Sequence, residues 1–391
     1  MNPKIIENFF VFFSASFSGG YKIFAVFLIT LLFPVAFVQE FNTYYFIVLI
    51  CVSLGVMPLA SMMTAQKFSL TGLAKLVWLM FFSLTACGIV VVFQNELAIR
   101  FDVNLFIALL VSVFFVGGYE IARRELANSR SFQQVFICGV ISTLLFLLVF
   151  FADRYQYSDP VSMILFFSIC FGLPIFGSII AKQRGASFFG GVKPFEFIKN
   201  YTSACISNSS SSLIAYLLPL TLVSLLQSDI SPYLAVIFSA ANLFMLVPRY
   251  MAEKNIPLMR NGGDLASIAG KTFFTTLVYL SFIFLCAFIA FLTIDIRDFW
   301  LYFLLFSSLQ LTQLTLPYSN VLMVNNNFSL LLKINIFGLA PYALLLFLFF
   351  CSSTNLQISY MIILLYMLSS VIKTILTRTY CQRIFQTPRN V

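Results

Sequence analysis

The chain contains no histidine, and only 9% of its 391 residues are charged. Average globular domains carry about 25% charged residues. The missing histidine excludes Ser-His-Asp and Cys-His catalysis and every histidine-ligated metal site. Charge this sparse cannot cover a water-facing surface. A soluble enzyme, a nucleic-acid-binding module and a disordered chain are therefore all disfavoured.

The cysteines form no CxxC pair. All eight are separated widely, and most lie inside apolar runs: Cys51, Cys87, Cys138, Cys170, Cys205, Cys286, Cys351 and Cys381. In such surroundings cysteine behaves as a small hydrophobic residue. We therefore expect neither a disulfide framework nor a metal centre.

Hydrophobic residues, by contrast, make up 61% of the chain. A bilayer-spanning helix needs roughly 20 apolar residues, so this supply suits about twelve helices. Apolar runs broken by polar clusters predict twelve spans: 9–38, 43–65, 73–93, 105–121, 134–151, 160–181, 203–227, 232–250, 270–293, 299–324, 330–351 and 357–376. The first run is too long for a cleaved signal peptide, and we interpret it as the first span.

The basic residues divide unequally between the two sides of these spans. Of the 23 Lys and Arg, nineteen fall on the side that holds both termini, and Arg100, Arg154 and Arg297 fall on the other. Lys22 lies inside the first span. Cytoplasmic loops carry the excess of Lys and Arg, so both termini are predicted to be cytoplasmic. We expect a multi-pass protein of a bacterial inner membrane.

A faint internal repeat divides the spans into two sets of six. The stretch 39–45 after the first span is similar to 227–233 after the seventh, and each ends in a tyrosine. The fold class expected is an all-α polytopic membrane protein, with two six-helix halves around a central cavity. The predicted limits are 1–181 for the N-terminal half, 182–202 for a cytoplasmic linker, 203–376 for the C-terminal half and 377–391 for a cytoplasmic tail.

Lys22 is the most unusual polar residue within a span. It lies 13 residues beyond Phe9, which is about 20 Å into a helix and too deep to reach either interface easily. Ser14, Ser18 and Lys22 share one helix face. One interpretation is a lysine that hydrogen-bonds to carbonyls inside the bundle. The other, which we favour, is a cation that lines a cavity for an anionic substrate.

Five other spans carry polar residues inside them or at their ends. Asn208 and Tyr216 share a stripe of the seventh span, and Gln310 and Gln313 lie within the tenth. These side chains could line a hydrated cavity or join helices by hydrogen bonds. Arg249 and Lys333 lie near the ends of spans. Each could anchor its helix at the membrane interface or could bind the substrate. Glu120, Arg123 and Arg124 end the fourth span, either as a gate that contains an ion pair or as a plain interfacial cluster.

A nucleotide-binding loop is not present. Gly270-Lys271-Thr272 matches the end of the P-loop pattern, but Leu265 stands where the first glycine belongs. We expect no cofactor, no catalytic residue and no metal ligand. An ion gradient, the substrate gradient or consumption of the product downstream would then drive the protein.

The organisation resembles the Wzx-type flippases of lipid-linked O-antigen units, which belong to the multidrug/oligosaccharidyl-lipid/polysaccharide exporter superfamily. The resemblance covers the whole chain. The matching local features are Ser14 to Lys22, the sequence Glu120-Ile121-Ala122-Arg123-Arg124, the run Ser207 to Ser212, and Val247-Pro248-Arg249-Tyr250.

The resemblance implies alternating-access translocation of undecaprenyl-pyrophosphate-linked glycan units to the periplasmic leaflet. Lys22 would meet the pyrophosphate, although members of the family often have several cavity cations and acids and this sequence shows clearly only one. The implied partners are this lipid-linked oligosaccharide, membrane lipids, a polysaccharide polymerase and a chain-length regulator. No nucleic acid partner is expected.

Two other classes remain open. An O-antigen polymerase-type membrane glycosyltransferase is similarly apolar, but it has a large periplasmic loop, and the longest one here is about 94–104. A small-molecule exporter of the same superfamily would more often have a membrane-buried acid, and the sequence shows none at mid-depth. We expect the protein not to be an enzyme.

Overall fold

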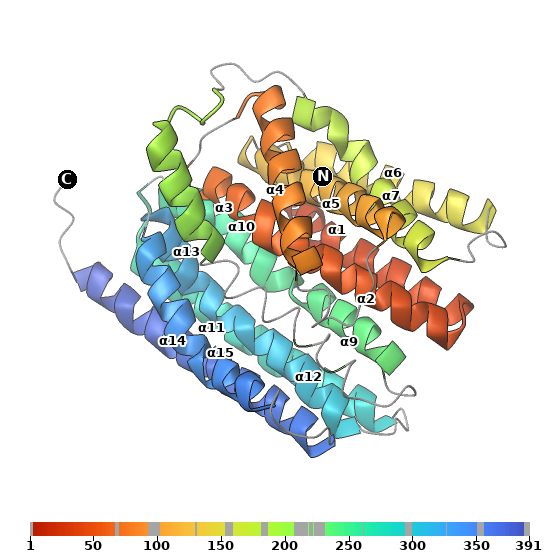
Figure 1. Cartoon of the computed structure of the whole chain (residues 1–391). Coiled ribbons are helices and arrows are strands. Elements are labelled where there is room, and N and C mark those ends of the chain that lie inside the picture. The colour runs from red at the N-terminus through yellow and green to blue at the C-terminus, as the bar shows by residue number, and fades with distance from the viewer. Residues whose placement is uncertain are drawn as a thin grey trace. The chain divides into compact units, whose positions relative to one another are not determined.

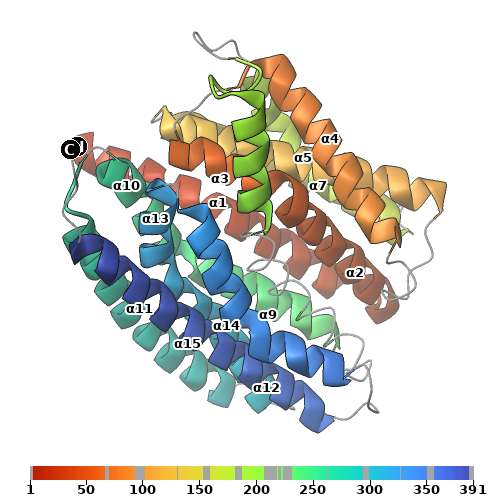
Figure 2. The same cartoon turned by 60° about the vertical axis from the view of Figure 1, so that its left-hand side comes forward.

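The computed structural model of the full chain is built from helices (Figures 1 and 2). It describes residues 3–66, 70–92, 102–129, 131–152, 159–180, 187–206, 231–260, 262–293, 299–325, 327–349 and 356–386, together with Leu218 and Leu222. The chain divides into two compact units, Met1–Leu217 and Leu218–Val391, each of which is described here by itself. The predicted limits of the halves and linker stay predictions.

In its described residues, the first unit contains the seven α-helices α1 to α7, a π-helical turn and one further helix over residues 194–206. The elements are α1 (Pro3–Leu32), α2 (Val35–Cys51), the π-helical turn η1 (Val52–Val56), α3 (Met57–Gln66), α4 (Gly72–Val92), α5 (Val103–Asn128), α6 (Phe132–Ala152) and α7 (Pro160–Ile180). α2, η1 and α3 follow one another without a gap and form one span, Val35–Met63.

The second unit is also mainly helical in its described ranges. Its elements are α9 (Ser231–Phe244), α10 (Leu246–Arg260), α11 (Leu265–Thr293), α12 (Phe299–Leu311), the 3-10 turn η2 (Thr312–Thr315), α13 (Leu316–Val324), α14 (Phe328–Phe349) and α15 (Leu356–Gln386). α14 packs along α15, and the two run side by side in both views.

The predicted fold class, an all-α polytopic membrane protein, is confirmed. Among the described residues, eight helices are long and apolar enough to cross a membrane, or nine if the two parts of α1 count as one span. Those two parts meet at 51° near Ser16. The Ser16 hydroxyl donates to the Phe12 carbonyl at 2.5 Å, a bond that competes with the helix ladder and bends helices.

Several predicted boundaries are wrong. α11 begins at Leu265 rather than at 270, and α15 continues to Gln386 rather than ending at 376. The first span does not run to residue 38, because Pro34 interrupts it and α2 begins at Val35. Proline cannot supply the amide hydrogen that a continuous helix needs. The expected loop at 39–42 therefore lies inside α2. The fourth span does not end at 121, since α5 continues to Asn128 and carries the charged residues 120, 123, 124 and 125 within the helix.

α5 and α7 have the most extensive contact between any two helices of the first unit. Gly172 of α7 makes this possible, because a Cβ atom there would overlap the backbone of Phe115 on α5. α1 packs against α6 and also contacts α5. The close approach of α1, α5 and α7 positions the polar cluster described next.

Candidate functional site

Glu120 is the centre of a buried polar cluster in the first unit. Its Oε1 atom accepts a hydrogen bond from the Ser18 hydroxyl of α1 at 3.0 Å. Its Oε2 atom accepts from Arg123 Nε at 3.3 Å and from Arg123 Nη2 at 3.1 Å. Ser18, Glu120 and Arg123 are all buried. The carboxylate therefore joins α1 to α5 through both of its oxygens.

Lys22 extends this cluster by one turn of α1. Its ammonium lies 5.5 Å from the centre of the Phe171 ring on α7, in the range of a cation–π contact. Lys22, Arg123 and Arg124 are all close enough to Glu120 to interact with its charge. Three cations and one carboxylate leave the cluster with a formal charge of +2. The sequence showed clearly only Lys22 as a candidate cavity cation, and the structure places Arg123 and Arg124 near the same carboxylate.

Aromatic rings surround the lysine side of the cluster. The Phe171 ring lies 4.2 Å from Tyr119, 4.9 Å from Tyr21 and 6.1 Å from Phe17, centroid to centroid. The Tyr21 hydroxyl donates to the Phe167 carbonyl at 3.0 Å. This packing fixes the rings and lowers the local dielectric constant, which strengthens the interaction of the cations with any anion that reaches them.

The sequence-based interpretation underestimated the acids of α5. Glu120 and Glu125 are both buried within the first unit, whereas we placed Glu120 at the end of a span and did not consider Glu125. The signal was present in the sequence: Glu120 and Arg123 stand at i and i+3, the spacing of side-chain neighbours on a helix. Of the two alternatives for the predicted gate residues, the ion pair forms between Glu120 and Arg123, and their gating role stays a prediction.

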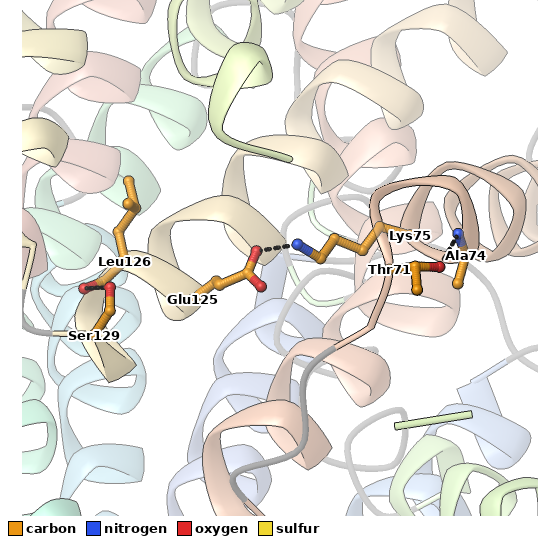
Figure 3. Close-up of polar contacts among 6 residues, drawn as sticks. All are labelled: Thr71, Ala74, Lys75, Glu125, Leu126 and Ser129. Atoms are coloured by element: carbon orange, nitrogen blue, oxygen red, sulfur yellow. Dashed lines mark hydrogen bonds and ion pairs between the residues drawn. The ribbon is translucent and has the colours of Figure 1, made fainter. Parts of the chain in front are cut away.

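A second buried ion pair lies on another face of α5 (Figure 3). Lys75 of α4 contacts Glu125 with 2.5 Å between Nζ and Oε2, and the lysine side chain is fully buried. Thr71 caps the start of α4 by accepting from the Ala74 amide at 3.2 Å. From the sequence, we counted Lys75 among the nineteen basic residues on the side of the membrane that holds both termini. That count gave no sign of its ion pair with Glu125.

The glutamines of the second unit join helices. Gln310 of α12 is fully buried, and its Nε2 atom donates to the Ala241 carbonyl of α9 at 2.5 Å. Gln313 of η2 donates to the Met245 sulfur at 3.2 Å and to the Thr312 hydroxyl at 3.1 Å. Of the two interpretations left open for these residues, their contacts favour interhelical bonding.

The described contacts assign no role to the remaining predicted site residues. Lys333 of α14 is exposed, and Arg249 lies in α10 with a side chain outside the described set. Asn208 and Tyr216 lie outside the described residues. Their substrate-binding roles stay predictions.

An apolar cavity of about 290 Å³ lies between α9, α11 and α12 of the second unit. Ala240 and Phe244 line it from α9, Ala287 from α11 and Phe306 from α12. Such a lining offers nothing to a sugar or a phosphate. Among the described residues, no group of three or more Cys, Asp or Glu could hold a metal ion.

Solved structures share the architecture of this chain along almost its whole length. A eukaryotic MATE transporter, AtDTX14, is 12% identical with a TM-score of 0.69, covering 98% of this chain and 96% of its own. The chain has the MATE fold. Neither a family model nor a curated protein sequence matches it.

Two further structures with the MATE fold are of multidrug resistance MATE family transporters of the MOP superfamily. The outward-facing one is 12% identical with a TM-score of 0.59, covering 98% of this chain and 96% of its own. The inward-facing one is 11% identical with a TM-score of 0.52, covering 97% and 95%. At 11–12% identity, these structures show a shared fold.

Proposed function

We propose that this protein is a flippase for lipid diphosphate-linked polysaccharide repeat units. In this proposal it lies in a bacterial inner membrane with both termini cytoplasmic, and it carries the hydrophilic head group to the periplasmic leaflet. The substrate is an undecaprenyl-pyrophosphate-linked glycan. A polysaccharide polymerase and a chain-length regulator would act on the translocated product. No cofactor takes part.

The observation that carries the proposal is the formal charge of +2 at the Glu120 cluster. A diphosphate diester carries two negative charges at neutral pH, so the cluster and this group would neutralise each other. Buried charge is tolerated only when it is paired. A diphosphate is attracted to this group of cations whereas a cationic drug is repelled by it, which favours the flippase over an exporter of cationic drugs.

The side chains suit a phosphate chemically. The guanidinium of Arg123 presents a planar set of donors that matches phosphate oxygens, and Lys22 contributes a compact charge on a flexible stem. While the site is empty, Glu120 holds Arg123 and Ser18 in place. The diphosphate would compete with Glu120 for Arg123, and the aromatic rings around Lys22 would exclude water.

The MATE fold supports alternating access as the route. Solved transporters with this fold face outward in one case and inward in another. A charged, hydrophilic head cannot cross about 30 Å of hydrocarbon without a protein. The head would enter a polar path from one side and leave it on the other. The apolar cavity of the second unit suits hydrocarbon and not the head.

The test is deletion of the gene in its host, followed by lipopolysaccharide gels and mass spectrometry of lipid-linked intermediates. We expect loss of long surface chains, with complete repeat units trapped on the cytoplasmic face. Surface chains of a single unit would mean that the protein is a polymerase. Unchanged surface polysaccharide would favour the exporter and overturn the proposal.

Complementation then tests the charge. Lys22→Ala and Lys22→Glu are expected to lower surface polysaccharide roughly tenfold or more, because a hydrogen bond to a charged group contributes about 1.5–3 kcal/mol. Lys22→Arg should restore most of it. The matched control is Lys271→Ala, which removes an exposed lysine at the start of α11. Normal polysaccharide with both Lys22 variants, at normal protein levels, would overturn the charge role.

A further inference from the structure

The segment 187–206 is attached to the start of α4 by main-chain and aromatic contacts. Ser187 pairs with Leu70 in a short parallel bridge, and its carbonyl accepts from the Thr71 amide at 3.2 Å. Trp78 of α4 packs its ring 5.2 Å from Phe197 and 5.8 Å from Phe188, centroid to centroid. The segment is therefore a fixed part of the first unit and not a free connection.

The inner face of the helix 194–206 caps the π-helical turn η1. The Tyr201 hydroxyl donates to the Gly55 carbonyl at 2.7 Å, and the Cys205 thiol donates to the Leu54 carbonyl at 3.2 Å. The Tyr201 ring stacks on Phe82 at 4.1 Å. Single π-helical turns inside α-helices occur frequently at functional sites. Any force on this helix thus acts directly on the irregular turn of a membrane span.

The outer face of the same helix is apolar and exposed. Phe195 is 81% exposed, Ile198 54% and Ile206 44%. Phe195, Ile198 and Ile206 follow one another at helical spacing, so they form one stripe. Two exposed lysines, Lys193 and Lys199, accompany the start of this stripe.

The sequence of this region carries more positive than negative charge. Residues 182–202 contain Lys182, Arg184, Lys193 and Lys199 against the single acid Glu196. Four basic residues beside a membrane span, combined with an exposed apolar stripe, are the pattern of a segment that binds anionic lipids. A soluble anion would leave Phe195 and Ile198 without a partner.

We infer that the segment 187–206 is a binding surface for anionic phospholipids. Phe195 and Ile198 insert among the acyl chains, and Lys193 and Lys199 contact the phosphates of the head groups. Because Tyr201 and Cys205 hold the opposite face to η1, lipid occupancy also sets the packing of Trp78, Phe82 and the π-helical turn. This inference does not depend on the identity of the transported molecule.

The test uses the full chain with Trp300→Phe, which leaves Trp78 as the only tryptophan because the sequence contains two. The protein is placed in nanodiscs of equal parts phosphatidylcholine and phosphatidylglycerol. Bromine is attached to the acyl chains of one lipid or of the other, and quenching of Trp78 fluorescence is measured. We expect stronger quenching by brominated phosphatidylglycerol, since the lysines enrich that lipid beside Trp78.

The double substitution Lys193→Gln/Lys199→Gln is expected to remove this preference, at about fivefold in lipid affinity for each lysine. The matched control is Lys254→Gln/Lys271→Gln, which removes two exposed lysines of the second unit and should keep it. Equal quenching by both brominated lipids would overturn the inference. So would an unchanged preference in the Lys193/Lys199 variant. Loss of the preference on adding inorganic pyrophosphate at constant ionic strength would identify a soluble-anion site instead.

Discussion

Lys75 and Glu125 form a buried ion pair in which each charge opposes the dipole of its own helix. Lys75 lies near the N-terminus of α4, where the helix dipole is positive, and Glu125 lies near the C-terminus of α5, where it is negative. Each charge is unfavourable in its place, and their contact at 2.5 Å offsets both effects. The pair therefore fixes these two helix ends to each other (Figure 3).

Replacing one residue of this pair should lower the stability of the protein more than replacing both residues. Lys75→Met alone or Glu125→Leu alone is expected to destabilise the protein by about 3–5 kcal/mol, because a buried charge loses its partner. The double variant Lys75→Met/Glu125→Leu should recover most of that loss. Thermal unfolding of the four proteins in detergent measures the coupling. Additive losses in the double variant would contradict a direct pair.

Glu120 should contribute more to stability than its hydrogen-bond donor Ser18. Glu120→Gln removes the ion pair with Arg123 and is expected to cost about 3–5 kcal/mol. Ser18→Ala removes one hydrogen bond, for which about 0.6–1.7 kcal/mol is typical inside a membrane protein. Melting temperatures of both variants give the order. Equal shifts would mean that the carboxylate acts only as an acceptor for Ser18.

Gly172 should not tolerate a side chain, because a Cβ atom there would overlap the Phe115 backbone. Gly172→Ala is expected to destabilise by about 1–3 kcal/mol, the usual cost of overpacking. Gly177→Ala on the same helix is the control, since a Cβ atom at that position meets nothing within 4 Å. There the change should be neutral or slightly stabilising. Expression level and melting temperature distinguish the two glycines.

Gln310 should act as a structural link between α12 and α9. Gln310→Leu removes the bond to the Ala241 carbonyl and is expected to cost about 1 kcal/mol. Transport, measured as surface polysaccharide at equal protein level, should stay within about twofold of the parent because the bond is within the bundle. Abolished transport with normal stability would instead place Gln310 in the substrate path.

The sequence was sufficient to predict a polytopic helical membrane protein and most of its spans. Transfer of a segment into hydrocarbon depends on its own composition, so hydropathy reports it without knowledge of neighbours. For the same reason Lys22 could be singled out, because a charge in the middle of an apolar run is unfavourable wherever the run packs. The exceptions were boundaries such as those at Pro34, beyond residue 121 and beyond residue 376, where local backbone chemistry and tertiary contacts determine helix length.

Only the tertiary structure decided which polar groups meet. Ser18 and Glu120 are separated by 102 residues and Lys75 and Glu125 by 50, and no local pattern connects them. The sequence placed Lys75 among the basic residues of one side of the membrane and indicated no partner for it. Pairing depends on which helix faces pack together, which is a property of the whole unit. Composition thus determined that the chain enters a membrane, and helix packing decided that its internal charges gather around Glu120.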